Sequence, residues 1–122
     1  MNKKDSFLVN RLKSVKYAFK GAYLLITTES SIKIQCVIGL IMTILGFYFK
    51  LSSTEWIIQI LCIALIIAIE GINTAIEEVA DFIHPEHHSK IGLIKDLAAG
   101  AVFIFAIAAV IVGCIIYFPK IF

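Results

Sequence analysis

The sequence predicts an all-α membrane protein in which an N-terminal amphipathic surface helix precedes three transmembrane helices. Hydrophobic residues make up 60% of the chain, against about 45–50% in soluble domains, and the mean hydropathy is +0.93. With only 122 residues, the chain is too short to hide that excess in a water-soluble core. Residues 97–118 carry no charged side chain at all. The length also predicts a single domain over residues 1–122.

The surface helix is predicted over residues 6–28. Its apolar residues recur at spacings of three and four, which aligns them along one helical face: Leu8, Leu12, Val15, Phe19, Ala22 and Ile26. Lys13, Lys16 and Lys20 lie off this stripe. A basic amphipathic helix of this kind is typical of a segment that lies in the membrane interface.

The three spans are predicted at about residues 32–49, 54–83 and 93–118. Apolar residues dominate 34–49 and 56–69, and the helical pattern of the second span continues until Pro85 ends it. We expect a polar loop from His84 to Gly92, and we expect Pro119 to end the third span. Because basic residues favour the cytoplasmic side, the surface helix and the 84–92 loop are predicted to lie in the cytoplasm.

An acidic stripe on the second span is the most informative feature of the sequence. Glu70, Asn73, Glu77 and Asp81 are separated by three, four and four residues, which confines them to an arc of about 80° on one helical face. Acidic side chains at membrane depth are costly, so they mark sites where an ion, a proton or a polar cleft is accommodated. Glu78 points away from this face, and we expect Glu55 and Glu78 to be solvated or to face lipid headgroups.

The stripe fits two kinds of chemistry about equally well. Carboxylate oxygens suit Mg²⁺, which uses one or two carboxylates and completes its shell with water and phosphate. Phosphoryl transfer needs such a metal, a cation on the phosphates and a group that receives the proton of the acceptor. The stripe, Glu29 and the pair Lys95-Asp96 supply these parts. The same carboxylates would equally serve a proton or ion pathway. The P-loop and protein-kinase signatures are absent.

Two segments resemble the bacterial diacylglycerol kinase family, which includes undecaprenol kinases of the same fold. They are Glu70 to Asp81 (EGINTAIEEVAD) and Lys95 to Val102 (KDLAAGAV). Lys16 to Gly21 (KYAFKG) and Glu29 also match the family pattern, and the resemblance covers essentially the whole chain. It implies a homotrimer with active sites shared between subunits, located in the bacterial cytoplasmic membrane with the active site facing the cytoplasm. It also implies ATP as cosubstrate with Mg²⁺ or Mn²⁺, and a lipid alcohol, undecaprenol or diacylglycerol, as acceptor.

The resemblance also implies roles for individual residues. Glu70 would accept the proton of the lipid hydroxyl and, with Ala99, contact the lipid. Asn73 would support this catalytic site, and Glu29 and Glu77 would hold the metal. Besides Glu29 and Glu77, the residues implied to bind the nucleotide are Tyr17, Asp81, Glu86, His87, His88, Lys95 and Asp96.

Two other functions compete with the lipid kinase. A small ion- or proton-conducting membrane protein would use the Glu70–Asp81 stripe without needing Lys95 or ATP. A non-catalytic membrane subunit would tolerate Glu77→Gln. The net charge of +2 gives no indication of nucleic-acid binding. The histidines His84, His87 and His88 are typical of a solvated loop more often than of a zinc site.

Overall fold

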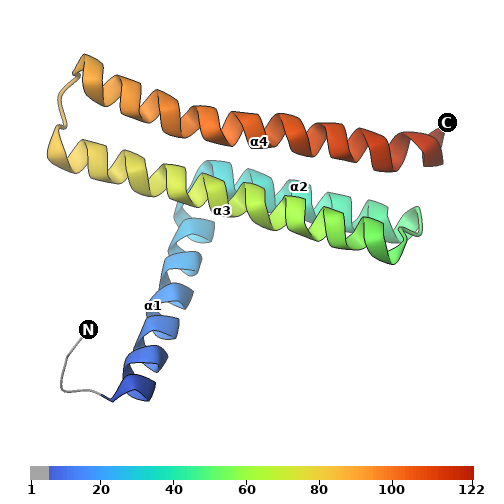
Figure 1. Ribbon diagram of the computed structural model, residues 1–122, viewed down its shortest axis with the longest axis horizontal. Helices are drawn as coiled ribbons and strands as arrows, with labels where there is room; N and C mark the ends of the chain where they lie inside the picture. Colours follow the sequence, from blue (N-terminus) through green and yellow to red (C-terminus); the bar gives the residue numbers. More distant parts are fainter. Residues whose placement is uncertain (1–5) are drawn as a thin grey trace.

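The computed structural model describes residues 6–122, which form four α-helices and no strand. They are α1 (Phe7–Thr28), α2 (Ser30–Tyr48), α3 (Ser53–Ile83) and α4 (Ser89–Ile121). In Figure 1, α2, α3 and α4 run side by side, whereas α1 leaves this bundle steeply from a point about halfway along α3. The predicted all-α architecture with three long apolar helices is confirmed.

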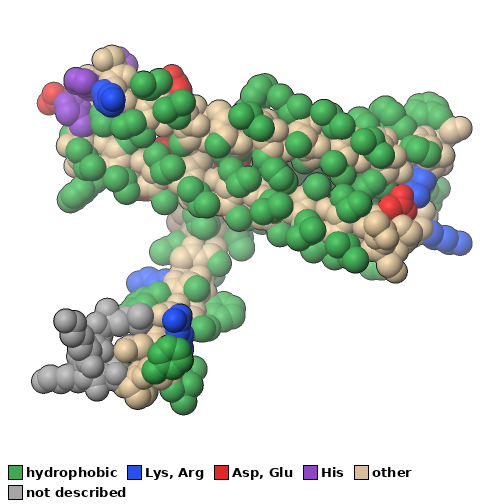
Figure 2. Space-filling model, in the orientation of Figure 1, with side chains coloured by type: hydrophobic (Ala, Val, Ile, Leu, Met, Phe, Trp, Pro, Cys, Tyr) green, Lys and Arg blue, Asp and Glu red, His purple; other side chains and the backbone are tan. Residues whose placement is uncertain are grey.

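The bundle has an apolar middle and two polar ends. The helices α2, α3 and α4 are each long and apolar enough to cross a membrane. On the face drawn in Figure 2, charged side chains and histidines gather at the end formed by the α3–α4 loop and at the opposite end, with hydrophobic side chains between. We call these the inner end and the outer end. At 1.5 Å per residue the 19 residues of α2 extend about 28 Å, close to the thickness of a bilayer's hydrocarbon core.

Short connections determine where the helices begin. Ser6 caps α1 by accepting a hydrogen bond from the backbone N–H of Val9 at 3.3 Å. A single extended residue, Glu29, separates α1 from α2 and allows the sharp change of direction. At the outer end, Ser52 and Glu55 form a capping box that starts α3.

The helix α4 differs from the prediction at both ends. It begins at Ser89 rather than near residue 93, because the imidazole of His88 caps it by accepting the Lys90 N–H at 3.0 Å. The loop is therefore shorter than the predicted 84–92. The prediction that Pro119 ends the helix is wrong, since α4 continues to Ile121. A proline in the last turn removes only one helical hydrogen bond, so the helix tolerates it there.

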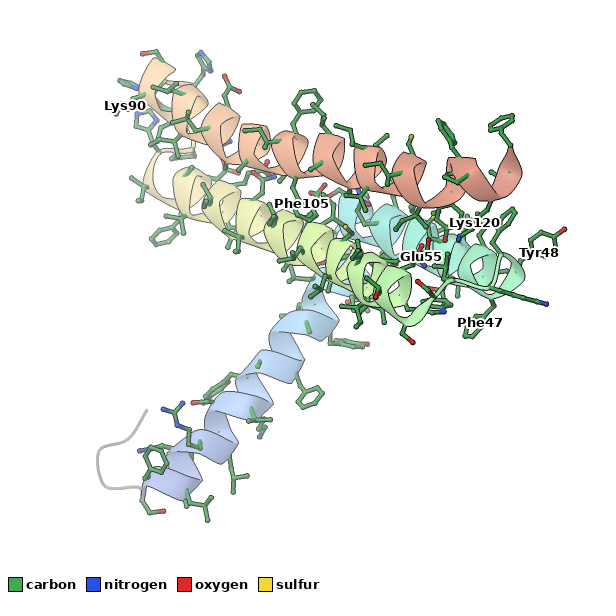
Figure 3. All side chains as sticks on the ribbon, turned by 45° about the vertical axis from the view of Figure 1, so that its right-hand side comes forward. Phe47, Tyr48, Glu55, Lys90, Phe105 and Lys120 are labelled. Carbon is green, nitrogen blue, oxygen red and sulfur yellow. The ribbon has the colours of Figure 1, made fainter. Side chains whose placement is uncertain are left out.

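An ion pair joins the two helices at the outer end. The carboxylate of Glu55 lies 3.1 Å from Nζ of Lys120, and Figure 3 shows both residues at the end opposite to Lys90. That Glu55 faces lipid headgroups stays a prediction, but its carboxylate is bound by protein groups rather than by solvent alone. Its side chain is only 24% exposed, because it serves the capping box and the ion pair together.

The core is concentrated at the outer end, where α4 returns to the α2–α3 turn. Leu51, Ile116 and Tyr117 form a buried cluster. Next to it, the hydroxyl of Tyr117 donates to Oε1 of Gln59 at 2.5 Å, and Nε2 of Gln59 donates to the carbonyl oxygen of Met42 at 3.0 Å. This network ties α2, α3 and α4 together. From this outer cluster, a groove of about 690 Å³ runs between α2 and α4 to the middle of the bundle, where Gln35, Ile66 and Ala106 line it.

Candidate active site

The acidic face of α3 carries a preformed polar contact. Nδ2 of Asn73 donates to Oε1 of Glu77 at 3.4 Å. Oδ1 of the same amide is buried, and within residues 6–122 it has no hydrogen-bond partner. Thr74 turns its hydroxyl to the backbone carbonyl of Glu70 at 3.1 Å, so it does not compete for the carboxylates. An unpaired buried acceptor is costly, so this oxygen is available to a hydrogen-bond donor or a cation.

A glycine brings α1 against α3 beside Glu70. A Cβ atom added at Gly71 would lie 2.9 Å from Cδ1 of Leu25, closer than a side chain is normally found. The backbone N–H of Glu29, one turn after Leu25, donates to the Leu25 carbonyl oxygen at 3.2 Å. Because Leu25 lies one turn before Glu29 and Gly71 follows Glu70, this contact brings the α1–α2 junction against the part of α3 that carries Glu70.

At the inner end, Lys95 joins α4 to α3. Its Nζ donates to Oδ1 of Asp81 at 2.5 Å, and both side chains stay partly accessible, with 37% and 55% of their surface exposed. The ammonium group is thus held at the end of the acidic face while remaining open to solvent on one side. A cation in this position is available to a phosphate group.

The α3–α4 loop encloses a small polar pocket next to Lys95. The pocket measures about 230 Å³, and its walls come from the loop and the first turns of α4. Nδ1 of His84 lies 2.8 Å from the carbonyl oxygen of Glu86, and the rings of His84 and His88 are 5.3 Å apart. Four of the residues expected to bind the nucleotide line this pocket: Glu86, His87, His88 and Lys95.

The donors on this face fit a hard divalent cation. Within residues 6–122, no group of three or more carboxylate, imidazole or thiol ligands converges on one point. Mg²⁺ does not need such a group, because it typically takes one or two carboxylates and fills its remaining positions with phosphate and water. The carboxylate of Glu77 and the unpaired Oδ1 of Asn73 offer that partial set of oxygens.

Three of the residues predicted for the site, Tyr17, Asp96 and Ala99, have no contact with the acidic face of α3 or the loop pocket among the interactions that the described residues make. Tyr17 lies on the exposed length of α1, and no residue of α1 lines the loop pocket. Asp96 and Ala99 are exposed on α4, one turn apart.

The sequence did not predict the contact between Gly71 and Leu25. Its only signal is a glycine in the interior of a helix, which indicates a close approach without naming the partner.

The sequence matches the family model described as prokaryotic diacylglycerol kinase over residues 16–117. It is 37% identical to undecaprenol kinase of Bacillus subtilis over 108 residues, which covers 88% of each chain. It is 30% identical to diacylglycerol kinase of Haemophilus influenzae, covering 94% of this chain and 98% of the relative. The diacylglycerol kinase of Escherichia coli K12 is also 30% identical, with 86% of each chain covered. This chain therefore belongs to the prokaryotic diacylglycerol kinase family.

Proposed function

We propose that this bacterial membrane lipid kinase transfers the γ-phosphate of Mg²⁺-bound ATP to the hydroxyl of a lipid alcohol at the cytoplasmic face of the membrane. The acceptor is undecaprenol or diacylglycerol, the lipids named for its relatives. The observation that carries the proposal is the acidic face of α3, where Asn73 donates to Glu77 and its own buried Oδ1 has no partner within residues 6–122, one turn from Glu70.

The position of Glu70 along the bundle supports this reaction. The contact between Leu25 and Gly71 puts Glu70 at the level where α1 departs. If α1 lies in the membrane interface, as its sequence predicts, the lipid hydroxyls are at this same level. The part of α3 beyond Glu70 is 13 residues, or about 20 Å, and it extends into the cytoplasm together with the loop pocket. Glu70 then meets the lipid headgroup from one side and the nucleotide from the other.

The reaction follows from these positions. The carboxylate of Glu70 accepts the proton of the lipid hydroxyl as the hydroxyl oxygen attacks the γ-phosphorus. The bond from the γ-phosphorus to the β–γ bridging oxygen breaks, and ADP leaves with that electron pair. Glu29 and Glu77 would hold the metal, and Asn73 would contribute its amide oxygen. When bound, Mg²⁺ neutralises charge that develops on the phosphate oxygens.

The remaining residues bind the nucleotide and the lipid. Lys95 contacts the phosphates, and Asp81 holds its ammonium group in place. Asp96 lies on the nucleoside side, and Ala99 contacts the lipid. Glu86, His87 and His88 line the nucleotide in the loop pocket.

The active site is shared between the subunits of a homotrimer. Tyr17 is exposed on α1, away from the loop pocket of its own protomer, and this separation favours a nucleotide contact with a neighbouring subunit. Intramembrane carboxylates also need partners that shield them from lipid.

Phosphate transfer tests the proposal directly. The purified protein in mixed micelles is given γ-labelled ATP with Mg²⁺, and undecaprenol and diacylglycerol are offered in separate reactions. Label in one lipid is the expected result, and chelation of the metal with EDTA should abolish it. Label in neither lipid, from protein shown to be folded, would reject both acceptors. Nucleotide-independent proton or ion flux that depends on Glu70 would instead favour a conducting protein.

A further inference from the structure

We propose that the groove between α2 and α4 binds the hydrocarbon chain of the acceptor lipid and selects for a single long chain. This inference rests on the proposed function, because the hydroxyl of that lipid must reach Glu70. The groove is a single channel of about 690 Å³, within the range of small-molecule binding sites, and its walls are almost entirely apolar.

The groove and the acidic stripe occupy the same face of α3. Gln59, Ile63 and Ile66 line the groove at spacings of four and three. Glu70 follows Ile66 by four residues, and Asn73 and Glu77 continue the same spacing. All six positions fall within an arc of about 80°. Ile66 lies only about 6 Å along the helix axis from Glu70, so a lipid whose hydroxyl is at Glu70 has its first methylene groups at the mouth of the groove.

On α4 as well, the expected lipid contact and the wall of the groove lie on one side of the helix. Ala99, the residue expected to contact the lipid, is followed at intervals of seven by Ala106 and Gly113, both of which line the groove. A spacing of seven returns to nearly the same side of a helix, so these small residues form one shallow track. The track leads from the level of Asp96 to the outer half of the bundle.

The single channel of the groove favours one long chain over two. On α2 its walls extend from Gln35 to Phe49, which is about 21 Å along the helix. Half of a bilayer's hydrocarbon core is about 15 Å, so a chain that fills the groove crosses the mid-plane. A polyprenol enters the groove with its one chain, whereas the two acyl chains of a diacylglycerol would compete for it.

The polar side chains in the wall do not oppose an apolar occupant. Gln59 is 5% exposed and Tyr117 is 6% exposed. Their polar atoms are engaged with each other and with the carbonyl oxygen of Met42. Because these groups are satisfied internally, the groove presents hydrocarbon to its occupant.

Gly113 provides a way to block the groove without disturbing the helices. A Cβ atom added there has no heavy atom within 4 Å, so Gly113→Leu should place its side chain in the open channel. Ala108→Leu is the matched control, since Ala108 is exposed in the same apolar length of α4, about 7.5 Å along the helix axis from Gly113, and does not line the groove.

The test compares kcat/KM for undecaprenol with kcat/KM for 3-methylbut-2-en-1-ol, a prenol of one isoprene unit that ends at the mouth. The wild-type ratio should favour undecaprenol. In Gly113→Leu the ratio should fall about tenfold, the effect of displacing about two methylene groups from an apolar wall, and in Ala108→Leu it should be retained. An unchanged ratio in Gly113→Leu, or an equal fall in Ala108→Leu, would overturn the proposal. A changed number of subunits in Gly113→Leu would do the same, because it would show that a second copy fills the groove.

A binding measurement separates failure of the groove from failure of the kinase reaction. Trp56 is the only tryptophan, and its ring lies over Gly46 beside the outer cluster near the groove's far end. A prenol of five isoprene units, about the length of the groove, brominated at its hydrocarbon terminus should quench Trp56 fluorescence in the wild type and in the inactive variant Glu70→Gln, and should quench it much less in Gly113→Leu. Equal quenching in Gly113→Leu and Ala108→Leu would overturn the proposal even if no lipid is phosphorylated.

Discussion

Nζ of Lys95 donates to Oδ1 of Asp81 at 2.5 Å and so joins the inner ends of α3 and α4 beside the loop pocket. Such a pair has two possible functions, to hold the helices together or to orient the lysine for a ligand. Partly exposed ion pairs contribute only about 0–1 kcal/mol to stability, which favours the second function.

Replacing the two partners separately should distinguish these functions. Lys95→Gln should raise KM for ATP by about tenfold to a hundredfold, because it removes a charge-assisted contact to phosphate. Asp81→Asn should raise KM for ATP by less than about fivefold, which corresponds to the 0–1 kcal/mol of an exposed ion pair. Steady-state kinetics with varied ATP measures both. Equal effects of the two substitutions would mean that the lysine acts only by pairing with Asp81.

The unpaired oxygen of Asn73 predicts a metal-linked defect. Asn73→Ala removes that oxygen and the amide that orients Glu77 at 3.4 Å. The Mg²⁺ concentration for half-maximal activity should rise by at least about tenfold, as is typical when a group that orients a metal ligand is lost. Glu78→Gln is the control, since Glu78 is exposed and lies off the stripe, and its Mg²⁺ dependence should match the wild type. A metal dependence of Asn73→Ala equal to that of the control would contradict the site.

Gly71 and Leu25 should be energetically coupled. Gly71→Val adds atoms where a Cβ already lies 2.9 Å from Leu25 Cδ1, and overpacking of this kind costs about 1–3 kcal/mol. Leu25→Ala opens the same space, so in the double variant the cost of Gly71→Val should largely disappear. Thermal unfolding in detergent measures the four proteins of this cycle. Gly21→Val, where an added Cβ meets nothing, serves as the control, and strictly additive costs would refute the close contact.

The buried hydroxyl at the outer end should matter for stability. Tyr117→Phe leaves Oε1 of Gln59 without its donor in an apolar environment. The expected loss is about 1 kcal/mol, near the values found for hydrogen bonds between membrane helices. Unfolding by detergent titration measures it. Tyr48→Phe, at an exposed position of α2, should change stability much less, and equal losses would show that the network contributes nothing.

Local sequence patterns predicted the helices and the acidic face. Hydropathy located the three long helices, and the spacing of Glu70, Asn73 and Glu77 aligned them on one side of α3. Both properties repeat within a few residues along the chain, so they can be recognised without the tertiary structure.

Contacts between distant segments could not be predicted in this way. The pairing of Glu55 with Lys120 joins residues at opposite ends of two helices, and no local spacing relates them. The approach of Leu25 to Gly71 depends on the single extended residue Glu29. The early start of α4 depends on one imidazole rotamer, because His88 substitutes for the usual small capping residues. The Leu25–Gly71 contact and the early start of α4 place parts of the candidate site, the Glu55–Lys120 pair closes the opposite end of the bundle, and each required the structure.

Glu70 is proposed to act as the base in phosphate transfer, and the substitution Glu70→Gln is the decisive test of this role. Glutamine keeps the shape and a hydrogen-bonding oxygen but cannot accept the proton. Turnover with the lipid acceptor should fall by at least about a hundredfold, the lower range of general-base catalysis, while Mg²⁺-ATP binding measured by calorimetry stays close to the wild type. Wild-type turnover in Glu70→Gln would show that Glu70 is not the group that accepts the proton.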